Sequence, residues 1–266
     1  MPVIGRLRYL EAAAAGTARP RGTLLLIHAF PLNARMWEPQ LALAANGWRV
    51  IAPQLRSMDG GSTDQPATSM DEHAGDIVDL LDALHVEDAV VAGLSMGGYI
   101  AFALFRHAPR YIRAMVLADT RPQADTPEGV EGRRKMLALV KEKGPGAVAD
   151  EMMPKLLGEH TRRTRPEVAE RVRSLILASS ADAIGNAVTA LMTRPDSSPL
   201  LPSIHVPTLV VVGEHDTITP PALSEQMHQA IKGSEYVVIP NAGHLANLEQ
   251  PEAFNAAFAR FLEHRV

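Results

Sequence analysis

The feature that most constrains this chain is the stretch GLSMG at residues 93–97, which joins two segments of opposite character. Residues 88–92 (DAVVA) form a short apolar run typical of a buried strand, and residues 96–107 follow a helical pattern. A strand that turns sharply into a helix places Ser95 on a tight corner, where the glycines on either side let neighbouring backbone pass close by. We therefore predict that the Ser95 hydroxyl projects from the edge of a sheet as a nucleophile.

Apolar runs and helical patterns alternate along both ends of the chain, as expected for a mostly parallel sheet with helices on both faces. Strands are predicted at residues 23–28, 48–53, 114–118, 208–212 and 236–239. Helices are predicted over residues 74–84, 223–231 and 251–262. Ser69 and Glu72 have the spacing of a capping box ahead of the first of these helices.

The middle of the chain, residues 121–201, has a different pattern. Strand signals disappear, and helical patterns cover residues 133–143, 147–157, 166–180 and 183–192. The breaker sequence Gly144-Pro145-Gly146 separates the first two. We predict a helical cap at 121–201, inserted into a catalytic core made of residues 1–120 and 202–266.

The composition is that of an ordinary folded protein, with 46% hydrophobic and 21% charged residues in a chain of 266. A net charge of -4, with no run of five like charges, argues against nucleic acid as a partner. The absence of cysteine excludes disulfides, thiolate metal sites and a cysteine nucleophile. Neither an apolar leader nor a long apolar segment is present, so we expect a cytoplasmic protein that does not enter a membrane.

A serine hydroxyl needs a base to take its proton, and histidine is suited to this because it titrates near neutral pH. Of the 10 histidines, His244 is the best placed. It lies in a glycine-containing loop between the last predicted strand and the last helix, and such a loop reaches the same sheet edge as Ser95. We predict His244 as the general base.

The base in turn needs a carboxylate to fix its tautomer and to stabilise the imidazolium. Asp216 follows the strand at 208–212, and the order Ser95, Asp216, His244 is the chain order of this kind of triad. Asp119, which ends another strand, and Glu214 are the alternatives. We predict Asp216 as the acid.

The backbone N–H of Met96, at the start of a helix, and that of Phe30, in the loop after an early strand, are the predicted donors to an oxyanion. His28, in the same loop as Phe30, is interpreted as a structural residue that hydrogen-bonds the loop. Trp37 and Met96 are predicted to form walls of the substrate pocket.

Five motifs together resemble the α/β-hydrolase superfamily, and within it the capped carboxylesterase and 3-oxoadipate enol-lactonase-like branch. They are HAFP at 28–31, APQLR at 52–56, GLSMGG at 93–98, GEHD at 213–216 and NAGH at 241–244. The resemblance covers nearly the whole chain. It implies an eight-stranded, mostly parallel sheet, a helical lid inserted after strand 6, the triad described above, and hydrolysis of an ester or related acyl bond without a cofactor or metal.

Two departures from the family pattern affect the expected pocket. Family members commonly carry glycine at the position of Ala29, and an aspartate and a glycine-histidine pair at the positions of Gln54 and of Ser57-Met58. Neither departure touches a residue of the predicted triad. Both weaken the transfer of a substrate by analogy.

The function expected from these residues is hydrolysis of a carboxylic ester or lactone of a small molecule through an acyl-enzyme on Ser95. The protein is expected to be a monomer or a homodimer. Two alternatives use the same triad, one on a carbon–carbon bond and one with a peroxide or an alcohol in place of water as the acyl acceptor. A non-enzyme alternative is a small-ligand receptor built on the same fold.

Overall fold

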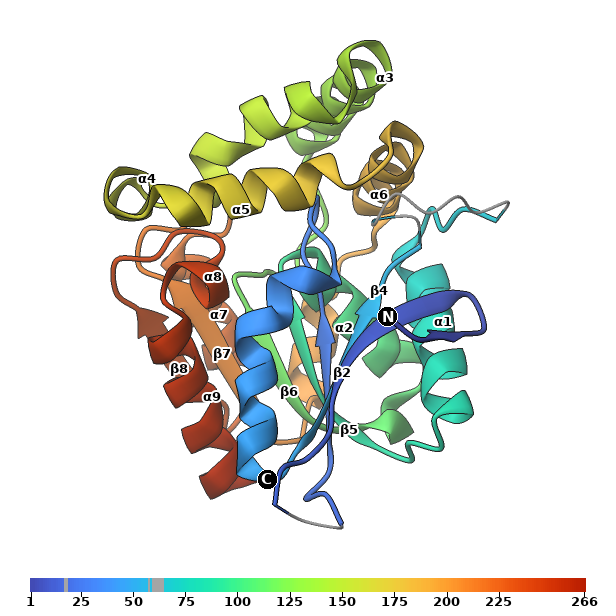
Figure 1. Ribbon diagram of the computed structural model, residues 1–266, viewed down its shortest axis with the longest axis vertical. Helices are drawn as coiled ribbons and strands as arrows, with labels where there is room; N and C mark the ends of the chain where they lie inside the picture. The colour runs from blue at the N-terminus through green and yellow to red at the C-terminus, as the bar shows by residue number, and fades with distance from the viewer. Residues whose placement is uncertain (17–18, 57, 59–64) are drawn as a thin grey trace.

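The computed structural model describes residues 1–16, 19–56, 58 and 65–266, and Figure 1 shows helices on both sides of one central sheet. In this part of the chain the sheet has eight strands in the order β1-β2-β4-β3-β5-β6-β7-β8. Their bounds are β1 Val3–Ile4, β2 Leu7–Ala12, β3 Thr23–Ile27, β4 Arg49–Gln54, β5 Ala89–Leu94, β6 Ile112–Ala118, β7 Thr208–Gly213 and β8 Glu235–Ile239. β2 pairs antiparallel with β1 and β4, whereas the pairs from β4 to β8 are parallel.

Alternate side chains of the central strands enter two separate hydrophobic clusters, because successive residues of a strand point to opposite faces. In β3, Leu25 and Ile27 pack on one face and Leu24 and Leu26 on the other, all with 0% exposure. The strand is therefore buried on both sides, which explains why its sequence is a continuous apolar run.

The two faces are covered by different helices (Figure 1). One face carries α1 Met70–Ala83, α2 Met96–His107 and α7 Pro221–Ala230, and the other carries the 3₁₀ segment η1 Ala34–Asn46, α8 Ala246–Glu249 and α9 Pro251–Arg265. A short 3₁₀ turn, η2 Pro109–Tyr111, precedes β6. The predicted capping box is confirmed, because the Glu72 N–H donates to the Ser69 hydroxyl oxygen at 3.2 Å.

Between β6 and β7 the chain forms the helices α3 Pro127–Leu156, α4 Glu159–Thr164, α5 Pro166–Leu177 and α6 Ala181–Thr193, followed by the 3₁₀ segment η3 Ser198–Ser203. Figure 1 shows α3 to α6 gathered beyond one end of the sheet. α3 is broken at Gly144, whose φ of 73° lies in the left-handed region, as the breaker sequence indicated. α3 packs on both α5 and α6, so the four helices form one layer.

A buried ion pair joins the two chain segments that connect this helical layer to the core. Asp125, ahead of α3, accepts a hydrogen bond from Arg194, which follows α6, at 2.8 Å, and both side chains are 2% exposed. The Arg194 guanidinium also lies over the ring of Tyr99 in α2, 4.3 Å from its centroid. We call the Asp125–Arg194 pair the stem. It fixes the start and the end of the inserted helices to each other and to the core.

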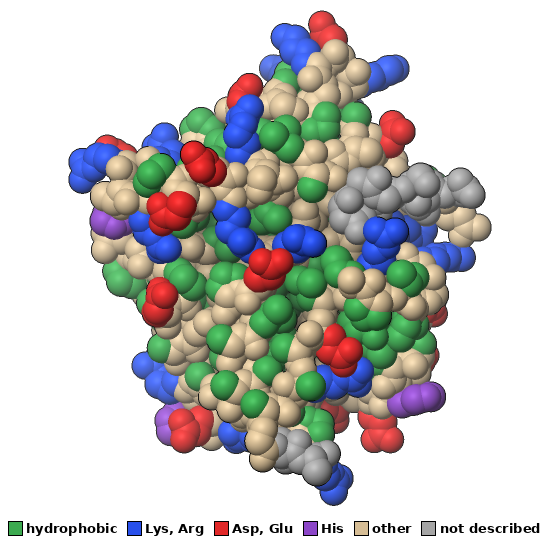
Figure 2. Space-filling view, in the orientation of Figure 1, with side chains coloured by type: hydrophobic (Ala, Val, Ile, Leu, Met, Phe, Trp, Pro, Cys, Tyr) green, Lys and Arg blue, Asp and Glu red, His purple; other side chains and the backbone are tan. Residues whose placement is uncertain are grey.

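Charged side chains of both signs are distributed over the surface. On the face shown in Figure 2, side chains of both charges are scattered over the helical layer and along its border with the core. An ion pair between Arg171 and Glu38, 2.7 Å apart, links α5 to η1. Among the described residues, no single helix is long and apolar enough to cross a membrane; α5 and α6, which meet at 94°, reach that length and composition only when joined.

Candidate active site

Ser95 occupies the sharp corner between β5 and α2 that the sequence predicts. Its φ of 54° and ψ of -112° are rare for a residue with a side chain. The corner is possible only because two glycines leave room: a Cβ on Gly93 would lie 2.2 Å from the carbonyl oxygen of Gly97, and one on Gly97 would lie 2.1 Å from that of Ile27. Thr120, after β6, donates its hydroxyl to the Ser95 carbonyl oxygen at 2.8 Å and thereby secures the corner.

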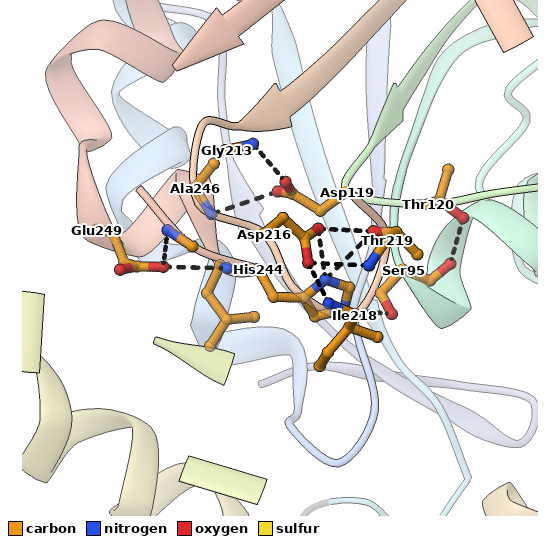
Figure 3. A network of polar contacts seen from close by, with 12 residues as sticks. Ser95, Asp119, Thr120, Gly213, Asp216, Ile218, Thr219, His244, Ala246 and Glu249 are labelled. Atoms are coloured by element: carbon orange, nitrogen blue, oxygen red, sulfur yellow. Dashed lines mark hydrogen bonds and ion pairs between the residues drawn. The ribbon is translucent and has the colours of Figure 1, made fainter. Parts of the chain in front are cut away.

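Ser95, His244 and Asp216 lie in one continuous hydrogen-bonded line (Figure 3). The Ser95 Oγ is 2.8 Å from His244 Nε2, and His244 Nδ1 is 2.8 Å from Asp216 Oδ2. All three side chains are buried, with Ser95 8%, His244 1% and Asp216 3% exposed. They meet because each residue follows the carboxyl end of a parallel strand. Ser95 follows β5, Asp216 follows β7 and His244 follows β8. The structure thus brings together the three residues that the sequence predicted as a set.

Asp216 is held by its own loop. Its Oδ1 accepts the backbone N–H groups of Ile218 at 2.8 Å and Thr219 at 2.9 Å, and its Oδ2 accepts the Thr219 hydroxyl at 2.6 Å. Burial acts to raise the pKa of this carboxyl group, but the adjacent His244 and the hydrogen bonds from His244 and Thr219 outweigh it. The pKa of Asp216 therefore lies below its ordinary value, and the group is a carboxylate able to orient the imidazole.

Asp119, the alternative acid, lies close by but has different contacts. It directly follows β6 with a φ of 44° and is fully buried. Its Oδ1 accepts the N–H of Gly213 at 2.8 Å, and its Oδ2 accepts that of Ala246 at 3.3 Å. Burial, assisted by the negative charge of Asp216, raises the pKa of Asp119 well above its ordinary value. These hydrogen bonds hold the end of β7, ahead of Asp216, and the start of α8, after His244, whereas the carboxylate that accepts from the imidazole is Asp216.

Glu214, the other alternative acid, is exposed. Its Oε2 accepts the backbone N–H of Asn241 at 3.0 Å in an exposed contact. This contact joins the end of β7 to the loop that follows β8, which contains His244.

The loop after β3 contains the other residues that the sequence singled out. His28 is fully buried, and its Nε2 accepts the Leu55 N–H at 3.2 Å while its Nδ1 lies 3.0 Å from the Ala29 carbonyl oxygen. This pair of contacts confirms the interpretation of His28 as a structural residue. Phe30 is 4% exposed and Met96, the first residue of α2, is 0% exposed. Ile27 of β3 and Gly93 of β5 are paired in the sheet. Phe30 lies three residues after Ile27 and Met96 three residues after Gly93, so both follow the same edge of the sheet.

Two further positions that the sequence singled out, Gln54 and Trp37, can be located. The Gln54 side chain is buried and accepts the Ala34 N–H at 3.0 Å, so it supports the start of η1. Ser57 lies outside the described residues. The ring of Trp37 is fully buried in η1 and packs against Phe254, 6.1 Å away between ring centroids. These contacts are those of a core residue, and a role for Trp37 in binding substrate stays a prediction.

The sequence analysis missed two residues that position the hydrogen-bonded set Ser95, His244 and Asp216. Thr219 secures Asp216, and the spacing of three residues, which resembles a capping turn, is a signal that could have shown it. Glu249 accepts the N–H groups on both sides of His244. No sequence spacing indicates that contact. Among the described residues, no group of three or more His, Asp and Glu side chains is arranged to hold a metal ion.

Comparison with known proteins places this geometry in a family. The sequence pattern of the alpha/beta hydrolase fold family matches residues 22–251. The chain therefore belongs to the α/β-hydrolase family, and the class of protein that its fold defines is a hydrolase of the α/β type.

Particular relatives share nearly the full length. A structure of a thermophilic esterase from Thermogutta terrifontis, with malate bound, superposes with a TM-score of 0.90 at 39% identity, covering 97% of this chain and 93% of that one. The enol-lactonase from Burkholderia xenovorans LB400 superposes with a TM-score of 0.87 at 27% identity, covering 97% and 96%. The 3-oxoadipate enol-lactonase 2 of Acinetobacter baylyi is 28% identical over 248 residues, which is 93% of this chain and 91% of the relative. The chain is similar to esterases and enol-lactonases over its core and its helical layer alike.

Proposed function

We propose that this protein is a serine hydrolase that cleaves a carboxylic ester or lactone of a small substrate through an acyl-enzyme on Ser95. The observation that carries the proposal is the line of two 2.8 Å contacts from the Ser95 hydroxyl through His244 to Asp216. A hydroxyl, an imidazole and a carboxylate in this order are the parts needed for nucleophilic acyl transfer. The similarity to esterases and enol-lactonases supports the same reaction class.

The first half of the reaction forms the acyl-enzyme. Ser95 Oγ attacks the carbonyl carbon of the substrate while His244 Nε2 takes the hydroxyl proton, and Asp216 stabilises the imidazolium that results. The oxyanion accepts hydrogen bonds from the backbone N–H groups of Phe30 and Met96. As the tetrahedral intermediate collapses, His244 returns the proton to the leaving oxygen, which departs as an alcohol or, from a lactone, stays attached to the acyl chain.

The second half releases the acid. A water molecule gives a proton to His244 Nε2 and attacks the acyl carbon, again with the oxyanion facing Phe30 and Met96. Collapse of this intermediate breaks the bond to Ser95 Oγ, which recovers its proton from His244. The balance is one water consumed for each acyl bond cleaved, with no cofactor required by the step.

We propose further that residues 121–201 act as a cap that governs access to Ser95. The support is that the helical layer lies beyond the sheet end from which Ser95 and His244 project, while the two side chains are only 8% and 1% exposed. A substrate must therefore enter beneath or between these helices, so their packing selects its size.

The experiment that tests the proposed function is hydrolysis of p-nitrophenyl esters of increasing acyl length and of a set of lactones in H₂¹⁸O, with product masses measured. Three proteins are compared: wild type, Ser95→Ala, and Ser224→Ala as a matched control for a second buried serine, in α7. We expect wild type and Ser224→Ala to release acid carrying one ¹⁸O from water, and Ser95→Ala to lose this turnover. Full activity in Ser95→Ala would refute the proposal. Products with cleaved carbon–carbon bonds, or transfer to an added alcohol or peroxide in preference to water, would favour the alternatives that use the same triad.

A further inference from the structure

The carboxylate of Glu249 lies between the loop that carries His244 and the helical cap. Glu249 ends α8 and its side chain is fully buried. Its Oε1 accepts the backbone N–H of Gly243 at 2.8 Å and that of Leu245 at 3.3 Å, the residues on either side of His244. Its Oε2 accepts the N–H of Gly158 at 2.8 Å, from the turn between α3 and α4. Figure 3 shows Glu249 beside His244, on the side away from Ser95.

The backbones joined by this carboxylate are themselves in contact. A Cβ on Gly243 would lie 2.4 Å from the nitrogen of Gly158, which is closer than real atoms approach. In the opposite direction, a Cβ on Gly158 would lie 3.1 Å from the nitrogen of Gly243 and 3.3 Å from Glu249 Oε2. Glycine at both positions therefore allows the cap turn to rest directly on the loop of the base.

A third glycine continues this contact toward Asp216. Gly213 ends β7, three residues before Asp216, and a Cβ on it would lie 2.0 Å from the carbonyl oxygen of Gly243. The loop of His244 is thus enclosed between the end of β7 and the cap turn. Because these backbones are closely packed, a displacement of the cap turn would move the loop and shift His244 relative to Asp216.

Glu249 has a second connection to the cap. Arg165, between α4 and α5, donates from Nη1 to the Glu249 carbonyl oxygen at 2.8 Å. Burial raises the pKa of the Glu249 carboxyl group, while the backbone N–H donors act in the opposite direction. The backbone N–H donors on both sides need an acceptor on each carboxyl oxygen, which a carboxylate supplies and an amide does not.

We propose that Glu249 is a positioning residue that couples the seat of the cap turn at Gly158 to the orientation of His244. The inference rests on the proposed function because it takes His244 as the general base. Glu249 does not touch the reacting atoms; it acts by fixing the N–H groups on either side of His244 to the same carboxylate that holds the cap. Turnover at Ser95 therefore depends on a cap contact remote from the serine.

The first test is Glu249→Gln, measured as kcat per active site, with the sites counted from the burst of p-nitrophenol that accompanies acylation. The amide has one acceptor oxygen, so it leaves either Gly158 or the pair Gly243 and Leu245 facing a donor. We expect kcat per site to fall about 10-fold to 100-fold, because a small misorientation of a catalytic group has that effect, with KM changed less than about threefold. Glu252→Gln, at the exposed start of α9, is the control and is expected to match wild type.

Counting sites separates positioning from stability. A role confined to stability would lower the number of active sites and leave the rate per site unchanged. If folded Glu249→Gln keeps the wild-type kcat per site, the inference is wrong.

The second test alters the cap side of the contact and leaves Glu249 in place. Gly158→Ala places a methyl group against Gly243 and Glu249, whereas Gly132→Ala, in α3, meets no atom within 4 Å and serves as the control. We expect Gly158→Ala to lower kcat per site in the same sense as Glu249→Gln, and Gly132→Ala to match wild type. Equal kcat per site in the two alanine variants would overturn the coupling, and this comparison decides the matter if Glu249→Gln does not fold.

The outcome for the inference is distinguishable from the outcome for the proposed function. If wild type gives no burst and no turnover, the acyl-enzyme on Ser95 is refuted, and the positioning of a base for that reaction is refuted with it. If wild type gives a burst that Ser95→Ala lacks, while Glu249→Gln and Gly158→Ala turn over like wild type, only the positioning role of Glu249 is refuted.

Discussion

The strand-end loops of the core and the helical cap above them are held in place by different kinds of contact. In the loop of Asp216, short-range backbone donors fix the side chain, since the N–H groups of Ile218 and Thr219 both donate to it. The cap is joined to the core by long-range side-chain contacts, chiefly the stem, Asp125 with Arg194, and the Glu249 carboxylate. We infer from this difference that the loops set the chemistry and that the cap sets access and alignment.

A second comparison lies within the loops, where two buried aspartates have opposite electrostatics. Asp216 contacts His244 and has a lowered pKa, whereas Asp119 contacts backbone N–H groups and has a raised pKa. Two neighbouring carboxyl groups thus have pKa values shifted in opposite directions because their surroundings differ. The account requires that they also respond differently to the same substitution.

The largest expected effect is therefore the contrast between Asp216→Asn and Asp119→Asn. Asp216→Asn should lower kcat by about 10⁴-fold, which is about 5 kcal/mol of transition-state stabilisation, because the imidazole loses its orienting carboxylate. Asp119→Asn should lower kcat by at most about 100-fold, since it disturbs only the loops. Steady-state kinetics of the two variants make the comparison. A larger loss of kcat in Asp119→Asn than in Asp216→Asn would contradict the assignment of Asp216 as the acid.

The next largest effect tests whether the stem, Asp125 with Arg194, holds the helical layer to the core. Asp125→Asn leaves Arg194 buried without its carboxylate, and we expect a loss of about 3–5 kcal/mol in the free energy of unfolding, measured by urea denaturation. Because Ser95, His244 and Asp216 are unchanged in this variant, kcat/KM should fall mainly through a higher KM. Glu131→Gln, which removes an exposed pair with Arg134 in α3, is the control and should leave both quantities unchanged.

The smallest effect concerns the border between α1 and the cap. His73, in α1, lines a cavity of about 10 Å³ together with Met96 and the cap residue Ala183, and its ring nitrogens have no hydrogen-bond partner in the described structure. Burial lowers the pKa of His73 to about 4, with the nearby Arg56 acting in the same direction and Glu72 in the opposite one.

The sign of the pH dependence follows from this depressed pKa. Below the unfolded-state pKa of about 6.5, the unfolded chain binds a proton at His73 that the folded chain does not, so stability falls as the pH drops toward 4. We expect the proton uptake by His73 to lower the free energy of unfolding by about 2 kcal/mol from pH 7 to pH 5. Urea unfolding at both pH values should show this difference in wild type and a smaller one in His73→Leu. Equal pH dependence in the two proteins would contradict the assignment.

The sequence predicts the core loops well because their signals are local. The GLSMG turn requires glycines next to Ser95, and the contacts of Gly93 and Gly97 show why. The capping box at Ser69 is similarly complete within four residues. Even the break in α3 at Gly144 is visible as a breaker sequence.

What the sequence does not predict depends on contacts between distant segments. Glu249 meets Gly158 across 91 positions, and no periodicity connects them. β2, residues Leu7–Ala12, was not predicted as a strand and pairs with β4, and η1 forms as a 3₁₀ segment with Pro39 inside it. Tertiary packing decides these elements, and local propensity carries little information about them.

The most direct test of the central claim is labelling with a p-nitrophenyl alkylphosphonate, followed by mass spectrometry of the intact protein and its peptides. The reagent reacts with a serine that a neighbouring base activates, and it leaves a stable phosphonyl ester. We expect wild type to gain a single adduct on Ser95 and Ser95→Ala to gain none. Folded wild type that stays unlabelled, or an adduct that forms equally fast in Ser95→Ala, would contradict the account.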